Sequence, residues 1–306
     1  MISKEGVTMI LDKLCLGTVQ FGLEYGINNP HGQPTEKEVF YMLDEAIEQG
    51  ITIFDTAFAY GNAEQLLGDY GISNHKVQVI SKLKPNLIGN NDPNTRKLVE
   101  DEIVQSLRRI KINVLDGYLL HTPTDFYNER IIDALQYCKY KGFIKSFGVS
   151  IYETKHALDV VKSKVVDYIQ VPYSIFDQRL DQTEFFTLAR ENNVVVFGRS
   201  AFLQGLILMK EDKVPGQLSK VKEYLRQFDK IINKYNISRA EAAFLFSYTH
   251  PGIDHVVFGV DNIEQLQEDI YISRKAIDFA KCREELSQCF QTIEKSIIFP
   301  SLWTKK

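Results

Sequence analysis

Residues 35–57 read TEKEVFYMLDEAIEQGITIFDTA, and this stretch contains the unit on which the fold prediction rests. Thr35 is followed three residues later by Glu38, a capping box that predicts the start of a helix. The apolar residues that follow fall on one face of that helix: Val39, Leu43, Ala46 and Ile47. From residue 51 the chain changes to the nearly continuous apolar run ITIFDTA, which is typical of a parallel strand buried on both faces.

The same alternation of helical pattern and apolar run extends along the whole chain. Eight runs rich in Val, Ile, Leu and Tyr are predicted as strands: residues 13–18, 51–57, 77–83, 114–121, 146–150, 166–172, 194–200 and 254–260. Amphipathic helical patterns lie between them, for example over residues 99–110 and 131–138. Alternating strands and helices favour a parallel sheet with right-handed crossovers. Eight units predict an α/β protein with a (β/α)8 TIM barrel, whose functional residues lie at the carboxyl ends of the strands.

A doubly wound sheet is the alternative, but no G-x-G-x-x-G follows the first strand, where the sequence reads LCLGTVQFG. Two regions exceed a minimal barrel. Residues 201–253 contain two helical patterns and a break at Val214-Pro215-Gly216, and residues 275–306 contain one more helix and the apolar tail SIIFPSLW. No linker divides the chain. We therefore expect residues 1–306 to form a single domain with extra helices before the eighth strand and at the C-terminus.

The composition narrows the range of partners. The 306 residues include 36 Lys and Arg and 40 Asp and Glu, for a formal net charge of −4. This imbalance is too small to predict nucleic acid or an anionic membrane as the main partner. No apolar run approaches the ~20 residues of a membrane span, and the first residues lack the core of a signal peptide. Four scattered cysteines predict free thiols and no metal site. We expect a cytoplasmic protein that acts on small molecules.

Four polar side chains of different chemistry stand at or just after the ends of the second, third and fourth strands: Asp55, Tyr60, Lys82 and His121. Because strand ends meet at one rim of a barrel, we expect these side chains to converge. A phenol with a pKa of about 10 is a poor acid at neutral pH, and a nearby ammonium should lower that pKa. A carboxylate would orient the lysine, and the imidazole would hydrogen-bond the reacting oxygen. Such a group can protonate an alkoxide that forms from a carbonyl.

Each of these residues alone has a simpler interpretation. An aspartate at a strand end usually caps a helix, a lysine there is usually solvated, and a histidine is usually structural. Lys84 also competes with Lys82 for the lysine role. The appearance of all four at barrel-consistent positions favours the catalytic interpretation.

With these residues the chain resembles the aldo-keto reductase superfamily, and in particular its bacterial monomer-type members. The matching segments run in the family's order from residue 13 to residue 272: LGTVQFG, FDTAFAYGNAEQLLG, VISKLKP, YLLHTP, FGVS, YIQVPYS, GRSAFLQGL and VVFGVDNIEQLQED. The resemblance implies that Tyr60 donates a proton to the carbonyl oxygen, with Lys82 and Asp55 tuning it and His121 orienting the substrate. It also implies a nicotinamide dinucleotide, bound across the top of the barrel, as the hydride source.

The resemblance further implies the residues that bind this cofactor. Ser150 and Gln170 match the groups that bind the nicotinamide carboxamide, while Gly17, Thr18 and Asp55 lie near the ring. The positions at the ring, along the pyrophosphate and at the adenosine end are Arg199, Ser200, Phe202, Gln204, Gly259, Gln265 and Asp269.

Two departures from the family's pattern concern the nicotinamide. Ile151 stands where an Asn commonly shares the carboxamide, so one contact should be lost or supplied by another group. Arg199 stands where an aromatic ring usually stacks on the nicotinamide. A guanidinium can stack on a planar ring, or it can bind an anionic group of the substrate.

A third departure concerns the choice between NADP and NAD. The strand-eight loop reads GVDNIEQLQED, in which Gly259, Val260 and Gln265 occupy positions where Lys or Arg normally binds a 2′-phosphate. Asp261 carries the opposite charge, although Arg239 or a lysine from another loop can compensate. The family's habit keeps NADP as the first expectation, and NAD is almost equally expected.

The sequence thus predicts an oxidoreductase that reduces an aldehyde or ketone with NAD(P)H. Two alternatives stay open: a cofactor-binding regulatory subunit with vestigial activity, and a barrel enzyme in which Lys82 forms a Schiff base. His31 and the loop GINNPHGQPT suggest a hydroxylated, sugar-like carbonyl or simply a solvated loop. The apolar tail, which holds the only Trp, either folds over the substrate opening or packs on the barrel wall. The oligomeric state is not indicated.

Overall fold

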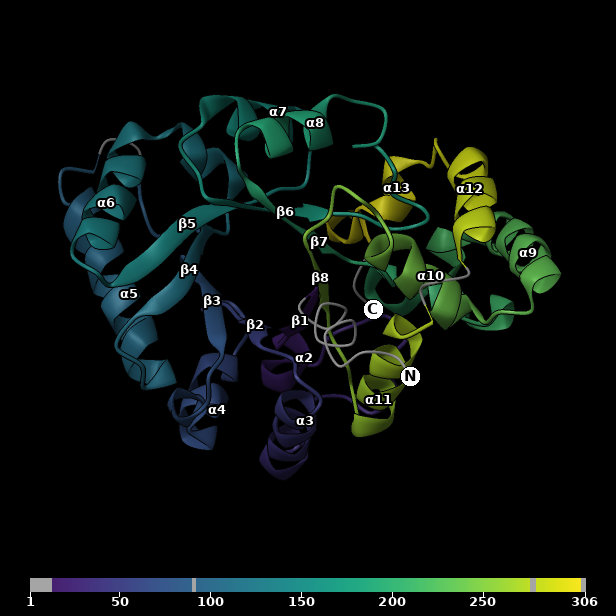
Figure 1. The fold of residues 1–306 in the computed structure, drawn as a ribbon, viewed down its shortest axis with the longest axis horizontal. Coiled ribbons are helices and arrows are strands. Elements are labelled where there is room, and N and C mark those ends of the chain that lie inside the picture. Colours follow the sequence, from purple (N-terminus) through teal and green to yellow (C-terminus); the bar gives the residue numbers. More distant parts are fainter. Residues whose placement is uncertain (1–12, 90–91, 276–278, 304–306) are drawn as a thin grey trace, which may run out of the picture.

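The computed structural model describes residues 13–89, 92–275 and 279–303. In these residues eight parallel strands form a closed barrel in chain order, with β8 paired to β1 (Figure 1). The strands are β1 Leu14–Gly17, β2 Ile53–Asp55, β3 Gln78–Lys82, β4 Leu115–Leu120, β5 Ile144–Ser150, β6 Tyr168–Pro172, β7 Val195–Arg199 and β8 His255–Phe258. Each coincides with a predicted run, so the TIM-barrel prediction is confirmed.

Helices surround the barrel and connect its strands (Figure 1). They are α2 Val19–Gly22, α3 Glu36–Glu48, α4 Ala63–Tyr70, α5 Thr95–Ile110, α6 Glu129–Tyr140, α7 Thr154–Ser163, α8 Phe185–Glu191, α9 Val221–Ile232, α10 Arg239–Tyr248, α11 Ile263–Ser273, α12 Ala280–Cys289 and α13 Lys295–Ile298. The two helices predicted between the seventh and eighth strands are α9 and α10. In the described part of the chain, no helix combines the length and apolarity needed to cross a bilayer.

Helix α3 begins where the capping box predicts. The Thr35 side chain accepts a hydrogen bond from the Glu38 backbone N–H, and the Glu38 carboxylate accepts one from the Thr35 N–H at 2.7 Å. These two bonds satisfy donors that the first turn of a helix leaves free. The predicted apolar face is buried at Val39, Leu43 and Ala46. It therefore packs this helix onto the barrel.

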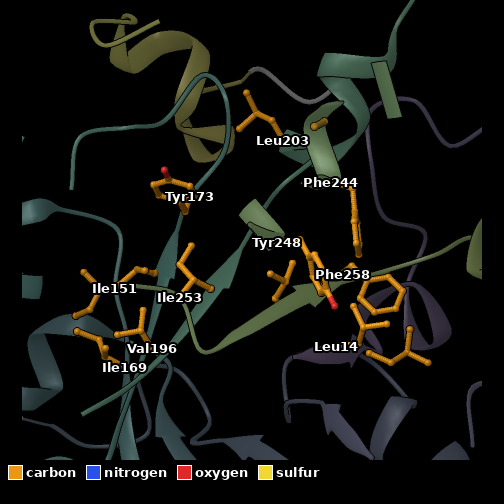
Figure 2. Packing of buried hydrophobic residues seen from close by; sticks show 14 of the residues in the cluster. Leu14, Ile151, Ile169, Tyr173, Val196, Leu203, Phe244, Tyr248, Ile253 and Phe258 are labelled. Atoms are coloured by element: carbon orange, nitrogen blue, oxygen red, sulfur yellow. The ribbon is translucent and has the colours of Figure 1, made fainter. Parts of the chain in front are cut away.

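Alternate side chains of each strand enter two separate cores. In β1, Cys15 points into the barrel interior, while Leu14 and Leu16 join the larger core between strands and helices. Figure 2 shows part of this outer core, in which Val196 of β7 lies beside Ile169 of β6, and Phe244 of α10 lies near Phe258 of β8. Because both faces of every strand are covered, the strands read as continuous apolar runs in the sequence.

The C-terminal tail packs against the carboxyl-end rim of the barrel. Ile297 and Ile298 of α13 are buried, and the Lys295 Nζ lies 2.8 Å from Glu153 Oε1, just after β5. The Arg179 guanidinium lies 4.7 Å from the centre of the Phe299 ring. The tail is thus held at the rim by both apolar and charged contacts. Residues 1–12, on which the signal-peptide expectation rests, lie outside the described residues.

Two glycines bring α2 against the turn that carries Tyr60. A Cβ atom at Gly22 would lie 1.7 Å from the backbone oxygen of Tyr60. Gly61 has a φ of +56°, and a Cβ there would lie 2.1 Å from the Gly22 oxygen. Only glycine allows this approach, so the backbone of the Tyr60 turn is positioned by main-chain packing.

We predict that Gly22→Ala lowers the free energy of unfolding by about 1–3 kcal/mol, because the added methyl group must displace backbone. Urea unfolding measures the loss. Gly216→Ala is the control, since no atom lies within 4 Å of a Cβ built there. Equal stability of the two variants would show that the Gly22 contact does not constrain the turn.

Candidate active site

Lys82 occupies the centre of a buried hydrogen-bond cluster at the carboxyl ends of β2 and β3. Its Nζ lies 2.6 Å from Asp55 Oδ2 and donates to the Thr56 backbone oxygen at 3.0 Å and to the Tyr60 hydroxyl at 3.1 Å. A lysine ammonium has three hydrogens to donate, and here each has an acceptor. Burial of the ion pair is nearly complete, with side chains of Lys82 and Asp55 that are 1% and 3% exposed. The rival Lys84 is exposed and lies over the Phe58 ring.

Neighbouring strands and helices fix the two charged residues of this cluster. The Thr18 backbone N–H and hydroxyl both donate to the Asp55 backbone oxygen, at 2.9 and 3.1 Å, and so tie the end of β1 to the end of β2. On β3, the Ser81 hydroxyl donates to the buried Glu64 carboxylate of α4 at 2.5 Å. The Arg109 Nε of α5 pairs with the same carboxylate at 2.6 Å. Lys82 therefore projects from a strand that is paired with β2 and β4 and is bonded to α4 through Ser81.

Tyr60 is a neutral phenol in this site. Burial raises the pKa of Tyr60 well above its ordinary value of 10, the Asp55 carboxylate raises it further, and Arg199 lowers it. The expectation of a lowered pKa for Tyr60 is therefore wrong. The carboxylate at 2.6 Å balances the lysine charge, so the pair presents little net charge to the phenol. Because Lys82 donates to the phenol oxygen, the hydrogen of Tyr60 is left for another acceptor.

His121 completes the set of four. Its ring centre lies 5.9 Å from that of Tyr60, with an interplanar angle of 89°. Burial, together with the charges of Lys82 and Arg199, lowers the pKa of His121 to about 3. Its buried Nδ1 has no hydrogen-bond partner in the described part of the chain. The structure thus brings together all four predicted residues and leaves a neutral imidazole able to bond a ligand.

The residues predicted near the nicotinamide lie beside this cluster. The Gln170 Nε2 donates to Asp55 Oδ1 at 2.8 Å, so its amide belongs to the Asp55 network. Ser150 pairs with Gln170 across β5 and β6, and both are buried. Gly17 pairs with Asp55 across β1 and β2, and Thr18 follows it. These five residues stand on or directly after four strands, and the bond between Gln170 and Asp55 links β6 to β2.

The residues predicted along the pyrophosphate follow β7 in a loop of unusual backbone. Ser200 and Gln204 have φ values of +69° and +53°, in the left-handed region. The Ser200 hydroxyl accepts from Arg199 Nη1 at 3.1 Å, and the Gln204 Nε2 donates to the Tyr25 hydroxyl at 2.9 Å. Phe202 is half-buried against α10. This segment therefore joins the loop after β1 at the barrel mouth.

The residues predicted at the adenosine end lie directly after β8, at Gly259, and within α11, at Gln265 and Asp269. Gln265 binds Asp261 twice, accepting from its backbone N–H at 2.8 Å and donating to its carboxylate at 3.4 Å. A Cβ at Gly259 would meet the Gln20 side chain at 2.2 Å. Asp269 is buried, burial raises its pKa well above the ordinary value, and within the described residues its carboxyl group makes no hydrogen bond.

Arg239, which was expected to compensate for the missing cation at a 2′-phosphate, binds other groups of the chain instead. Its Nε and Nη2 each lie 2.6 Å from the Asp229 carboxylate, and its Nη1 donates to the Met209 backbone oxygen at 2.6 Å. The hydrogen bonds of this guanidinium therefore join α9, α10 and the preceding loop.

Two tyrosines near the catalytic residues are absent from the sequence prediction. Burial raises the pKa of Tyr25 to about 12, and the proximity of Tyr60 contributes to that shift. The Tyr152 ring lies 4.6 Å from the Arg199 guanidinium. Neither residue belongs to a recognisable motif. The one sequence signal is the position of Tyr152, two residues after the end of β5, because residues that follow a barrel strand lie at the rim that carries the site.

The family model for the aldo/keto reductase family matches residues 13–284. The chain belongs to the aldo/keto reductase family. Among curated relatives, an uncharacterized oxidoreductase YqkF of Bacillus subtilis (strain 168) is 28% identical over 288 residues, which cover 87% of this chain and 90% of the relative. An NADH-specific methylglyoxal reductase of Escherichia coli (strain K12) is 24% identical over 260 residues, with 74% and 79% coverage.

Solved structures agree with this family assignment at the level of the fold. The aldo-keto reductase AKR11C1 from Bacillus halodurans, in its holo form, superposes with a TM-score of 0.76 at 20% identity, and covers 94% of this chain and 95% of that chain. The resemblance seen in the sequence is confirmed. This aldo-keto reductase is an NAD(P)H-dependent oxidoreductase that acts on small carbonyl compounds.

The pKa of His121 predicts a specific dependence of stability on pH. Since the folded-state pKa is about 3 against an ordinary 6.5, the unfolded chain binds more protons between these values, and stability falls as the pH falls. From about pH 7 to about pH 5, His121→Asn should lose less unfolding free energy than the wild type, by on the order of 1 kcal/mol. Urea unfolding at both pH values measures this. His31→Asn, at an exposed site, is the control. Equal pH dependence of wild type and His121→Asn would contradict a neutral buried imidazole.

Proposed function

We propose that this aldo-keto reductase reduces an aldehyde or ketone to an alcohol, with Tyr60 as the proton donor. The hydrogen-bonded chain from Asp55 through Lys82 to Tyr60 carries the proposal, because it leaves the phenol hydrogen facing a partner other than Lys82. A bound nicotinamide dinucleotide supplies the hydride. The residues of the chain bind and orient the reactants and move the proton.

The proton transfer follows from the geometry of the cluster. The neutral His121 donates a hydrogen bond to the carbonyl oxygen and orients it toward the Tyr60 hydroxyl. As the carbonyl carbon gains a hydride, negative charge collects on that oxygen, and the Tyr60 proton moves to it. The hydrogen bond from Lys82 stabilises the phenolate that is left, and Asp55 keeps Lys82 in place. A proton from solvent then restores the phenol.

The residues of the barrel mouth fit a nicotinamide dinucleotide. Ser150 and Gln170 would hold the carboxamide, Ser200 and Gln204 would lie along the pyrophosphate, and Asp269 would receive a donor of the adenosine. The buried Asp269 carboxyl group supports the last assignment, since it makes no hydrogen bond with the described residues. Ile151 stands in place of the common Asn, and its side chain has no polar atom that could bind the carboxamide.

We infer that NAD(H) is the preferred cofactor, ahead of the NADP(H) that the family's habit favours. The half-buried Asp261 stands at the loop that would meet the 2′ position, and Arg239 is bound to Asp229. A carboxylate repels a 2′-phosphate but accepts a hydrogen bond from a ribose hydroxyl. The E. coli relative, described as NADH-specific, has the same preference.

Binding measurements test this cofactor preference. We predict that the wild type binds NADH at least ~10-fold more tightly than NADPH, because the charge at Asp261 opposes the phosphate. Asp261→Lys should reverse or abolish the ratio of dissociation constants, measured by cofactor fluorescence. Glu191→Lys makes a comparable charge change at an exposed position at the end of α8 and should leave the ratio unchanged. Tighter NADPH binding by the wild type would contradict the inference.

Substitution of the proposed donor tests the reaction itself. Tyr60→Phe should lower the rate of aldehyde reduction by about 10²–10⁴-fold, because it removes the general acid. The dissociation constant for NADH should stay close to that of the wild type. Loss of NADH absorbance with a panel of aldehydes measures the rate, and Tyr41→Phe, at a phenol that is 58% exposed, is the control. Reduction by Tyr60→Phe at the wild-type rate would show that another group supplies the proton.

The Schiff-base alternative finds no support in the contacts of Lys82. All three hydrogen-bond directions of its amino group are used within the cluster, by a carboxylate, a backbone oxygen and a phenol. An imine at Nζ would break these contacts in a buried site. The amino group is therefore better suited to holding Tyr60 than to attacking a carbonyl.

The sugar-like substrate stays a prediction. In the polar loop after β1, the Asn29 side chain donates to the backbone oxygens of Tyr25 and Gly32 and accepts from the N–H groups of His31 and Gly32. The asparagine thus holds the loop in shape. Because the polar groups of Asn29 serve the loop itself, the polar residues of this loop do not require a hydroxylated ligand.

A further inference from the structure

Arg199 places an unbalanced positive charge at the mouth of the barrel. It is the last residue of β7 and is half-buried. Its Nη2 donates to the Ile151 backbone oxygen at 2.9 Å, and its Nη1 donates to the Ser200 hydroxyl at 3.1 Å. Both acceptors are neutral. Within the described ranges, no carboxylate forms an ion pair with Arg199, although a partly buried charge is normally paired.

Three other half-buried arginines are paired with carboxylates, whereas Arg283 donates to the Phe246 backbone oxygen and to the Tyr173 hydroxyl. Arg109 pairs with Glu64, Arg179 with Asp177, and Arg239 with Asp229, at N–O distances of 2.6, 2.7 and 2.6 Å. Each of these guanidinium groups serves to connect structural elements. Arg199 likewise has no carboxylate partner in the described chain, but it stands at the end of β7 beside Tyr60 and His121, where an anion from outside the chain can pair with it.

The guanidinium of Arg199 is also held in one orientation. It lies 4.6 Å from the centre of the Tyr152 ring, and the backbone oxygen of Tyr152 in turn accepts from Arg179 Nη2 at 3.0 Å. A guanidinium has five N–H donors, and two hydrogen bonds and a ring contact leave donors for a ligand. A fixed fork of donors suits a carboxylate or a phosphate, which accept two hydrogen bonds side by side.

This charge lies close enough to the catalytic residues to act on them. Arg199 lowers the pKa of Tyr60, of His121 and of Tyr25, so its field reaches the proton donor and the orienting imidazole. The positive charge of Lys82, in contrast, is balanced by Asp55 at 2.6 Å. Arg199 is therefore the unbalanced cation that a carbonyl substrate meets at the rim.

We propose that Arg199 binds a carboxylate or phosphate group carried by the carbonyl substrate. The proposal rests on the proposed function and assigns its substrate class: short aldehydes or ketones with an anionic group near the carbonyl. The pyrophosphate of the cofactor offers the same chemistry from another source. The two sources differ in which dissociation constant a substitution of Arg199 changes.

Two aldehydes of equal chain length test the proposal with NADH as cofactor. Butanal is neutral, and 4-oxobutanoate carries a carboxylate in place of the terminal methyl group. Arg199→Gln should lower kcat/KM for 4-oxobutanoate by ~10- to 100-fold more than kcat/KM for butanal, with the difference mainly in KM. The loss of the Arg199 charge near Tyr60 and His121 affects both aldehydes alike. Arg199→Lys keeps the charge without the fork and should fall between the wild type and Arg199→Gln.

A binding measurement gives a readout that is independent of turnover. Calorimetric titration of the NAD⁺-loaded enzyme with 4-hydroxybutanoate should show binding by the wild type and a ~10- to 100-fold loss in Arg199→Gln. The dissociation constant for NADH should change much less than that for 4-hydroxybutanoate. Lys84→Gln removes one exposed positive charge from the same rim and should change neither value.

The outcomes separate the proposals. Equal losses for both aldehydes in Arg199→Gln, together with weaker NADH binding, would assign the anion to the cofactor and overturn the substrate proposal. Equal binding of 4-hydroxybutanoate by wild type and Arg199→Gln would also overturn it. If the wild type reduces neither aldehyde and no other carbonyl, the proposed function itself fails. Selective loss of the anionic aldehyde supports both.

Discussion

The buried ion pair between Lys82 and Asp55 is the interaction on which the site depends. A buried charge is expensive unless it is paired and hydrogen-bonded, and removal of one partner from such a pair commonly costs about 3–5 kcal/mol. Here Thr56 and Tyr60 accept hydrogen bonds from Lys82, and Gln170 donates one to Asp55. Each hydrogen of the ammonium and each oxygen of the carboxylate therefore takes part in a hydrogen bond. The same bonds that make the charges tolerable also determine which way the Tyr60 hydroxyl can donate.

The barrel supplies this arrangement because its strands are parallel and closed. Residues at the ends of β2, β3, β4 and β6 come within hydrogen-bond or ring contact, although Asp55 and Gln170 are 115 positions apart in the chain. Around the central pair, the rim carries charges of opposite sign in different places. Arg199 presents an unbalanced cation at the end of β7, and Asp261 presents a carboxylate after β8. This distribution is the basis of our proposals that the substrate is anionic and that the cofactor lacks a 2′-phosphate.

The sequence was sufficient for the fold and for the four central residues, because both follow from local patterns. Apolar runs and capping boxes identify strands and helix starts, and a parallel barrel brings strand ends together. The pKa of Tyr60 could not be predicted, since it depends on how burial compares with a lysine charge that Asp55 already balances. The bond between Arg239 and Asp229 and the contact of Tyr152 with Arg199 likewise depend on loop geometry that no motif encodes.

A double-mutant cycle on the rate of aldehyde reduction tests the role of the ion pair most directly. Lys82→Met, Asp55→Asn and the double variant are compared with the wild type, with circular dichroism and NADH binding as checks that the barrel is intact. If the pair acts as one unit, the double variant loses no more activity than the worse single variant, because either substitution already releases the Tyr60 hydroxyl. Losses that add in the double variant would show that the two residues act separately and would contradict the account.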